Sequence, residues 1–130
     1  MEDVMIRISI LWIFAAITMC AHYALLFFEP DVFQKTFTGG SARLAIVETF
    51  ANWLIPSTMA FLSVTLEGLT NRYLNMVLGG LYILLSIFHL AKCPVVHISN
   101  KPSVHQLVLG ISTVVVTVLI FWYALSWQIS

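Results

Sequence analysis

The sequence predicts an all-α protein of four transmembrane helices that pack as an antiparallel bundle and form a single domain. Hydrophobic residues make up 60% of the chain and charged residues 9%, which is too apolar for a protein that folds in water. Four long apolar runs fill nearly all of the 130 residues, and a bilayer core needs roughly 20 residues per helix. We therefore expect an integral, multi-pass membrane protein with no soluble domain.

The first apolar run predicts a helix over residues 6–28. It should end before Glu29-Pro30-Asp31, which predicts a turn, because the proline disfavours a helical conformation in the residue before it. The stretch 32–37 beyond this turn is amphipathic. Since the first run is too long for the apolar part of a secretory signal, we expect it to remain in the protein as a membrane span.

The other three runs predict helices over residues 42–66, 72–91 and 103–127. Ser41 and Ser103 are suited to cap the N-termini of the first and last of these helices. Pro56 predicts a bend, because proline removes one hydrogen bond from the helix interior. The segment 68–71 predicts a tight turn, which would make the two helices that it joins antiparallel neighbours.

The two ends of the predicted bundle differ in charge and in aromatic content. The end with the two longer loops carries four of the six basic residues, which favours this end in the cytoplasm. The end with the chain termini is expected to carry an aromatic belt at the membrane interface. The belt would consist of Trp12, Tyr73, Trp122, Tyr123 and Trp127.

Three titratable residues inside the apolar runs lie at similar depths. At a rise of 1.5 Å per residue, His22, Glu48 and His89 lie roughly 6, 9 and 10 Å from the middle of their helices, all toward the long-loop end. A charge at the bilayer centre costs about 2.5 to 3.5 kcal/mol, so such groups usually face the bundle interior or a watered cavity. We therefore expect a polar pocket there, with Glu48 as a proton-sensitive acceptor and the histidines as its partners.

Polar and small residues recur at helical spacing on three of the predicted helices, and each set forms a stripe that should face protein. The stripes are Glu48, Asn52, Pro56, Met59 and Ser63; Asn75, Gly79, Tyr82, Ser86, His89 and Cys93; and Gln106, Gly110, Thr113 and Thr117. Within them, Asn52, Tyr82 and Ser86 could orient a ligand by hydrogen bonding. Packing alone also explains the stripes, because small and hydroxyl side chains let helices approach closely.

Three other arrangements would use the same residues. His89, Cys93 and His97 have the helical spacing of a soft metal site, although a proline interrupts it. His22 and His89 would have to face each other across a cofactor to ligate a haem. Cys20 and Cys93 differ in depth by about 13 Å, whereas the Cα atoms of a disulfide lie within about 7 Å. No metal site and no catalytic residue are therefore assigned, and the cofactor is left open.

Several short motifs are spread along the chain. They are Ile8-Ser9-Ile10-Leu11-Trp12-Ile13-Phe14, Glu29-Pro30-Asp31-Val32 with Thr38-Gly39, Ile55-Pro56 ahead of Leu62-Ser63, Asn71-Arg72 with Asn75, and Phe121-Trp122-Tyr123-Ala124. Together they resemble a family of small four-helix integral membrane proteins of bacteria and archaea that has no assigned function. Members often carry a glutamate before the Ile-Pro pair, where this chain has Leu54, so Glu48 or Asn52 would have to replace that group. The resemblance implies four transmembrane helices in a prokaryotic cell membrane and supplies no catalytic residue.

We expect the pocket to bind or move a small or amphiphilic ligand. Whether the protein is an enzyme is left open, with a role other than catalysis favoured. The expected ligand-binding residues are His22, Glu48, Asn52, Tyr82, Ser86 and His89. The alternative is an accessory or scaffolding subunit of a membrane complex, and a haem- or metal-dependent redox enzyme is a third class. Four thin helices enclose little volume, so we also expect a homo-oligomer. Zero net charge and the absence of a basic run give no reason to expect nucleic acid as a partner.

Overall fold

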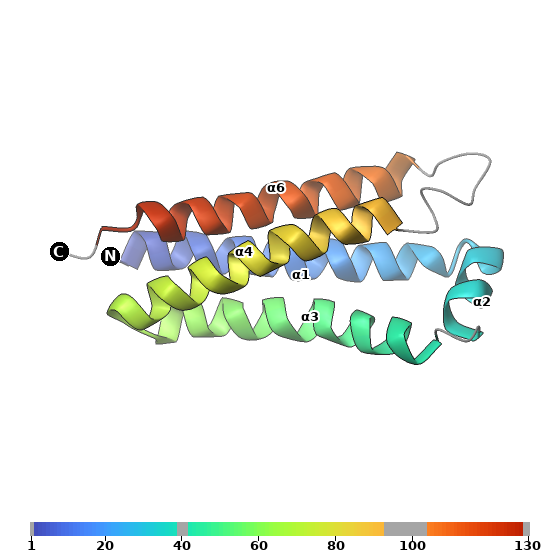
Figure 1. Ribbon diagram of the computed structural model, residues 1–130, viewed down its shortest axis with the longest axis horizontal. Helices are drawn as coiled ribbons and strands as arrows, with labels where there is room; N and C mark the ends of the chain where they lie inside the picture. The colour runs from blue at the N-terminus through green and yellow to red at the C-terminus, as the bar shows by residue number, and fades with distance from the viewer. Residues whose placement is uncertain (1, 39–41, 93–103, 129–130) are drawn as a thin grey trace.

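The computed structural model describes residues 2–38, 42–92 and 104–128, and these ranges contain helices and their connections but no strand (Figure 1). The helices are α1 (Glu2–Leu26), α2 (Pro30–Thr38), α3 (Ala42–Thr65), α4 (Gly68–Lys92) and α6 (Val104–Ser126). All but the short α2 are long and apolar enough to cross a membrane. The predicted fold, an all-α bundle of four such helices in a multi-pass membrane protein, is confirmed.

The four long helices run in alternating directions along the bundle, as predicted (Figure 1). α1 begins and α6 ends at one end of the bundle, which we call the terminal end. α2 lies at the opposite end, which we call the α2 end, and joins α1 to α3. Its Phe33 and Phe37 pack with Tyr23 against Leu26 of α1. The amphipathic stretch 32–37 is therefore part of a short helix whose apolar face covers the end of α1.

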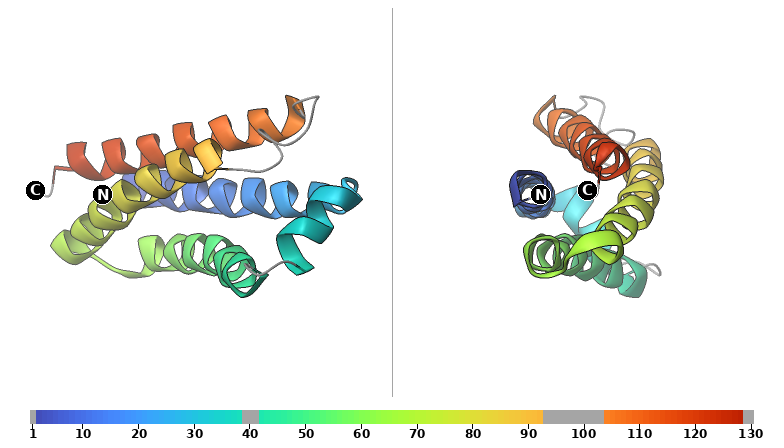
Figure 2. Two further views of the ribbon diagram at one scale, coloured as in Figure 1. Left: turned by 45° about the vertical axis from the view of Figure 1, so that its right-hand side comes forward. Right: turned by 90° about the vertical axis from the view of Figure 1, so that its left-hand side faces the viewer.

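The long helices do not all pack equally against one another. α1 packs against both α3 and α6, and α4 packs against α6. α3 and α4 are consecutive in the chain, yet they touch only sparsely. The end-on view in Figure 2 shows the resulting order around the bundle, which is α3, α1, α6 and α4. The helices expected over 42–66 and 72–91 are thus antiparallel, but each packs mainly against another helix.

The turn between α3 and α4 is shorter than the sequence predicts. α3 ends at Thr65 and α4 begins at Gly68, so the segment 68–71 is the first turn of a helix and not a tight turn. Gly68 has a φ of 62°, a left-handed conformation that glycine adopts without strain. The side-chain amide of Asn71 donates to the carbonyl oxygens of Ser63 (2.9 Å) and Leu66 (2.7 Å). These bonds satisfy the end of α3, so the chain can turn within two residues.

The other predicted boundaries differ from the observed ones by only a few residues. α1 begins at Glu2 and not at residue 6, because the polar residues at its start continue the same helix. α3 continues through Pro56, whose ring is buried in the bundle, and the bend expected there remains a prediction. The two expected helix caps, Ser41 and Ser103, lie outside the described residues.

Near the terminal end, a hydrogen-bonded network around Asn75 ties α1, α3 and α4 together. Its Oδ1 atom accepts from the indole N–H of Trp12 (2.7 Å) and from the hydroxyl of Ser63 (3.0 Å). Its Nδ2 atom donates to Oδ1 of Asn71 (2.6 Å). All four side chains are fully buried. Because no water reaches the apolar interior, each polar group in this network depends on the others for a partner.

The predicted aromatic belt is only partly present. Tyr73 and Trp122 are exposed near the terminal end, as a belt requires. The prediction is wrong for Trp12 and Trp127, which are 0% and 3% exposed and belong to the hydrophobic core. The indole of Trp12 can be buried because Asn75 accepts its N–H, so the ring has no need of the wet interface.

α4 and α6 approach each other closely at Gly79. A Cβ atom at this position would lie 3.3 Å from the backbone nitrogen of Phe121 and 3.4 Å from its Cα atom. At the neighbouring Gly80, a Cβ atom would meet only the Phe121 ring, 3.6 Å away. Nearer the start of α4, Arg72 donates to the carbonyl oxygens of Ala124 (3.2 Å) and Leu125 (3.0 Å) and so caps the C-terminal end of α6.

The two adjacent glycines of α4 give a matched pair of substitutions. We expect Gly79→Ala to lower the free energy of unfolding by about 1 to 3 kcal/mol, because the backbone at Phe121 would have to move to make room. Gly80→Ala should be neutral or stabilising by up to about 1 kcal/mol, since alanine is the better helix former. Unfolding in bicelles would measure both values. Equal effects of the two substitutions would contradict the close approach.

Removal of the central acceptor should disrupt the buried network. In Asn75→Leu the indole of Trp12 and the hydroxyl of Ser63 lose their acceptor, so we expect a loss of about 1 to 3 kcal/mol of stability. Tyr73→Leu is the control, because Tyr73 lies two residues earlier on the same helix and is exposed. The same unfolding measurement, with tryptophan fluorescence as the probe, should separate the two variants. A loss no greater than that of the control would argue against the network.

Candidate functional site

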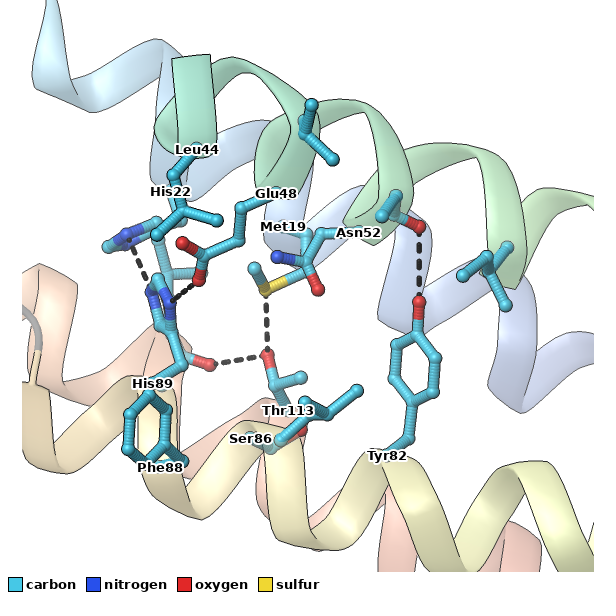
Figure 3. Close-up of a pocket in the computed structure, with 16 residues that line it drawn as sticks. Met19, His22, Leu44, Glu48, Asn52, Tyr82, Ser86, Phe88, His89 and Thr113 are labelled. Atoms are coloured by element: carbon cyan, nitrogen blue, oxygen red, sulfur yellow. Dashed lines mark hydrogen bonds and ion pairs between the residues drawn. The ribbon is translucent and has the colours of Figure 1, made fainter. Parts of the chain in front are cut away.

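A cavity of about 300 Å³ lies between α3 and α4, with α1 and α6 contributing its inner wall (Figure 3). It occupies the half of the bundle nearer the α2 end, where the sequence predicts a polar pocket. All six of the residues predicted to bind a ligand line this one cavity. They are His22 from α1, Glu48 and Asn52 from α3, and Tyr82, Ser86 and His89 from α4.

A chain of polar contacts crosses the bundle at the inner wall of the cavity. Nδ1 of His89 lies 2.9 Å from a carboxylate oxygen of Glu48, and its Nε2 lies 3.2 Å from Nε2 of His22 (Figure 3). Nδ1 of His22 is hydrogen-bonded to the side-chain oxygen of Gln106. The four residues come from α3, α4, α1 and α6 in turn. We call this set, Glu48, His89, His22 and Gln106, the polar chain.

Burial changes steadily along the polar chain. Gln106 and His22 are almost completely buried, at 1% and 5% exposed. The side chains of His89 and Glu48 are 20% and 45% exposed. Since Glu48 also lines the cavity, its carboxylate is the end of the chain that a molecule in the cavity would meet.

Two further polar residues hold the walls of the cavity in place. The hydroxyl of Tyr82 donates to the carbonyl oxygen of Ala51 on α3 (3.1 Å), and its ring packs edge-on against Trp12, with the ring centroids 5.4 Å apart. The cavity is thus linked to the core network at the terminal end. Nδ2 of Asn52 donates to the hydroxyl of Tyr23 (3.2 Å), so the amide has a defined orientation.

The rest of the lining is largely apolar and exposed. Four large side chains on α3 and α4 line the cavity and are each more than half exposed. They are Leu44, Val47, Leu85 and Phe88. Both helices are membrane spans, so this exposed side of the cavity faces the lipid chains. The cavity therefore opens sideways between α3 and α4, with its polar wall inside and an apolar mouth outside.

Gln106 is the residue of the site that the sequence does not single out. The sequence places it in the polar stripe of the last helix, which is equally well explained by packing. In the structure it is the partner of His22, and its Nε2 atom donates to the backbone oxygen of His22 (3.3 Å). The available signal is its depth, because a buried amide in an apolar run at the level of His22 needs a polar partner.

Cys20 and His105 are not members of the polar chain. Cys20 is exposed, whereas His22 is buried, so the two side chains lie on different faces of α1. His105 lies 3.8 Å from a carboxylate oxygen of Glu29, at the α2 end. Cys93 and His97, and with them the expected metal pattern and the disulfide question, lie outside the described residues.

The described residues do not favour either metal or haem at this site. No group of three His, Cys, Asp or Glu side chains among them is placed to hold a metal ion. His22 and His89 touch directly through their Nε2 atoms, 3.2 Å apart, so their rings leave no space between them for a haem. The arrangement is suited instead to hold and pass protons, since each contact joins groups that donate or accept hydrogen bonds.

Comparison of the chain with protein-family models, with curated proteins and with solved structures gives no match. The resemblance to a family of small four-helix membrane proteins therefore remains a prediction from the sequence. What the site does must be inferred from its geometry.

Replacement of Gln106 should change the state of His22. In Gln106→Leu, Nδ1 of His22 loses its acceptor, so we expect a different hydrogen-bonding signature for this ring in ¹⁵N-histidine NMR spectra in nanodiscs. Stability should fall by about 1 to 3 kcal/mol, because a buried donor is left without a partner. Gln34→Leu on the exposed face of α2 is the control. Unchanged His22 signals in Gln106→Leu would contradict the contact.

Proposed function

We propose that the protein binds an amphiphilic small molecule in the cavity between α3 and α4. The polar group of the ligand would contact Glu48, and its apolar part would extend through the mouth of the cavity into the lipid. The observation that carries this proposal is the position of the polar chain, which ends in a half-exposed carboxylate inside a cavity with an apolar mouth.

The cost of an ionisable group in a membrane supports a binding role over packing alone. Asp, Glu and His side chains within membrane spans are rare and usually mark substrate or ion pathways. If Glu48 served only to pack the helices, its side chain would be fully buried against His89. Instead the side chain is 45% exposed and lies next to a cavity of about 300 Å³. That volume is at the lower end of the range for small-molecule sites, about 300 to 1,000 Å³. It fits a compact polar group with part of an apolar tail.

Five of the polar residues that line the cavity have a role in this proposal. Glu48 is the acceptor that meets the ligand, and His89 and His22 adjust its charge through the contacts of the polar chain. Asn52 and Tyr82 orient the ligand from the two walls, and both are fixed by hydrogen bonds of their own. Such fixed side chains lower the entropy lost on binding.

The test is native mass spectrometry of the protein released from a mild detergent. We expect wild-type protein to retain a reproducible non-protein mass, and Glu48→Gln to lose it because the charged acceptor is gone. Glu67→Gln is the matched control, since Glu67 is an exposed carboxylate in the turn between α3 and α4. Wild-type protein that carries no ligand, or equal retention by Glu48→Gln, would count against the proposal. A defined protein partner in its place would favour a structural subunit.

A further inference from the structure

The hydrogen-bond partners of the two histidines determine which ring nitrogens carry protons. Nδ1 of His89 faces a carboxylate oxygen of Glu48, which accepts but does not donate when it is ionised. Nδ1 of His22 faces the side-chain oxygen of Gln106, and this amide is oriented because its Nε2 atom donates to the backbone oxygen of His22. With Glu48 ionised, both Nδ1 atoms therefore carry a proton.

The contact between the two rings then requires one more positive charge. A neutral imidazole has a single N–H group, and in both rings it is on Nδ1. The two Nε2 atoms, 3.2 Å apart, would otherwise point two lone pairs at each other. A proton between them turns this repulsion into a hydrogen bond. The resulting imidazolium is balanced by the carboxylate of Glu48, so the polar chain has no net charge, which is the state that an apolar medium favours.

A proton fits the space between the two rings better than a divalent metal does. A divalent ion bound by neutral His22 and His89 would leave the polar chain with a net positive charge inside the membrane, even with Glu48 ionised. The described residues also provide no group of three metal ligands.

We infer that the ligand of this site is an amphiphilic cation that exchanges with the proton held between His22 and His89. This inference rests on the proposed binding function and names its ligand class. A cation that reaches Glu48 balances the charge of its carboxylate in place of the imidazolium. The shared N–H bond then breaks, and the proton leaves to water. The histidines become neutral, so their Nε2 atoms are no longer held together and the two rings move apart. The site with its ligand again has no net charge.

The lining of the cavity favours a cation over an anion. The described lining residues include Glu48 but no lysine or arginine. Nδ2 of Asn52 is engaged by Tyr23, which leaves its Oδ1 atom as a further acceptor. The rings of Tyr82 and Phe88 line the same space, and aromatic faces attract cations. An anion would have to approach the carboxylate and bring a second proton with it.

The titratable groups that face the histidine pair are few among the described residues. α1 contributes Tyr23, whose ring packs edge-on against His22, α3 contributes Glu48, and α4 contributes Tyr82. α6 contributes the neutral Gln106 and Thr113.

Exchange of one proton for one cation predicts that the affinity for the cation falls as the pH is lowered. The fall should be close to tenfold per pH unit while the shared proton is bound.

The test compares octyltrimethylammonium with octyl sulfate, which have the same tail and opposite charge, on wild-type protein in nanodiscs. Isothermal titration calorimetry in two buffers of different ionisation enthalpy counts the protons exchanged. We expect the cation to bind at least tenfold more tightly than the anion, to release close to one proton per site, and to bind more weakly at lower pH. Glu48→Gln should bind the cation at least tenfold more weakly, and Glu67→Gln should behave as wild type.

The NMR spectrum of wild-type protein provides a readout that does not depend on a variant. ¹⁵N-histidine spectra should show one shared proton at the Nε2 atoms, and this signal should disappear when octyltrimethylammonium is added. Tighter binding of octyl sulfate with proton uptake would overturn the cation assignment and leave the proposed binding function standing. Binding of the cation without proton release would overturn the exchange. If neither probe binds, the ligand class is wrong, and the retained mass of the native protein decides separately whether the site binds a ligand.

Discussion

Buried polar groups in a membrane bundle depend on neighbouring side chains or backbone for their partners, because a membrane core offers no water. Two sets of residues meet this requirement at the two ends of the bundle. The network around Asn75 does so completely, with all of its side chains buried, and it joins α1, α3 and α4. The polar chain does so while leaving its last member, Glu48, open to a cavity. The first set holds the helices together, and the second has the geometry of a binding site.

The cavity exists because α3 and α4 are joined tightly at one end only. Gly68 and Asn71 close the turn at the terminal end within two residues. At the other end, α3 packs against α1 and α2, and α4 packs against α6 (Figure 1). α3 and α4 are therefore held by different partners, and side chains from both face the space between them (Figure 3).

The sequence predicts those features that depend on composition and on depth along a helix. Long apolar runs predict the four spans, and the depths of His22, Glu48 and His89 bring these residues to one level, where the structure joins them. Features that depend on how the helices are rotated and paired are not predicted. Its position near a helix end predicts that Trp12 lies at the membrane interface. In the structure Trp12 is buried in the core, where Asn75 accepts its indole N–H. Gln106 becomes part of the site only because α6 packs beside α1.

Under the proposed function, the sideways mouth of the cavity would determine where the ligand comes from. Its apolar rim, which includes Leu44 and Phe88, faces hydrocarbon, and the cavity lies off the centre of the bundle, toward the α2 end. A molecule that enters there arrives by diffusion within one leaflet. Its supply then depends on how much of it dissolves in that leaflet, and a membrane that concentrates it would fill even a weak site. If the proposed function holds, the lipid composition of a single leaflet is thus part of the chemistry of this protein.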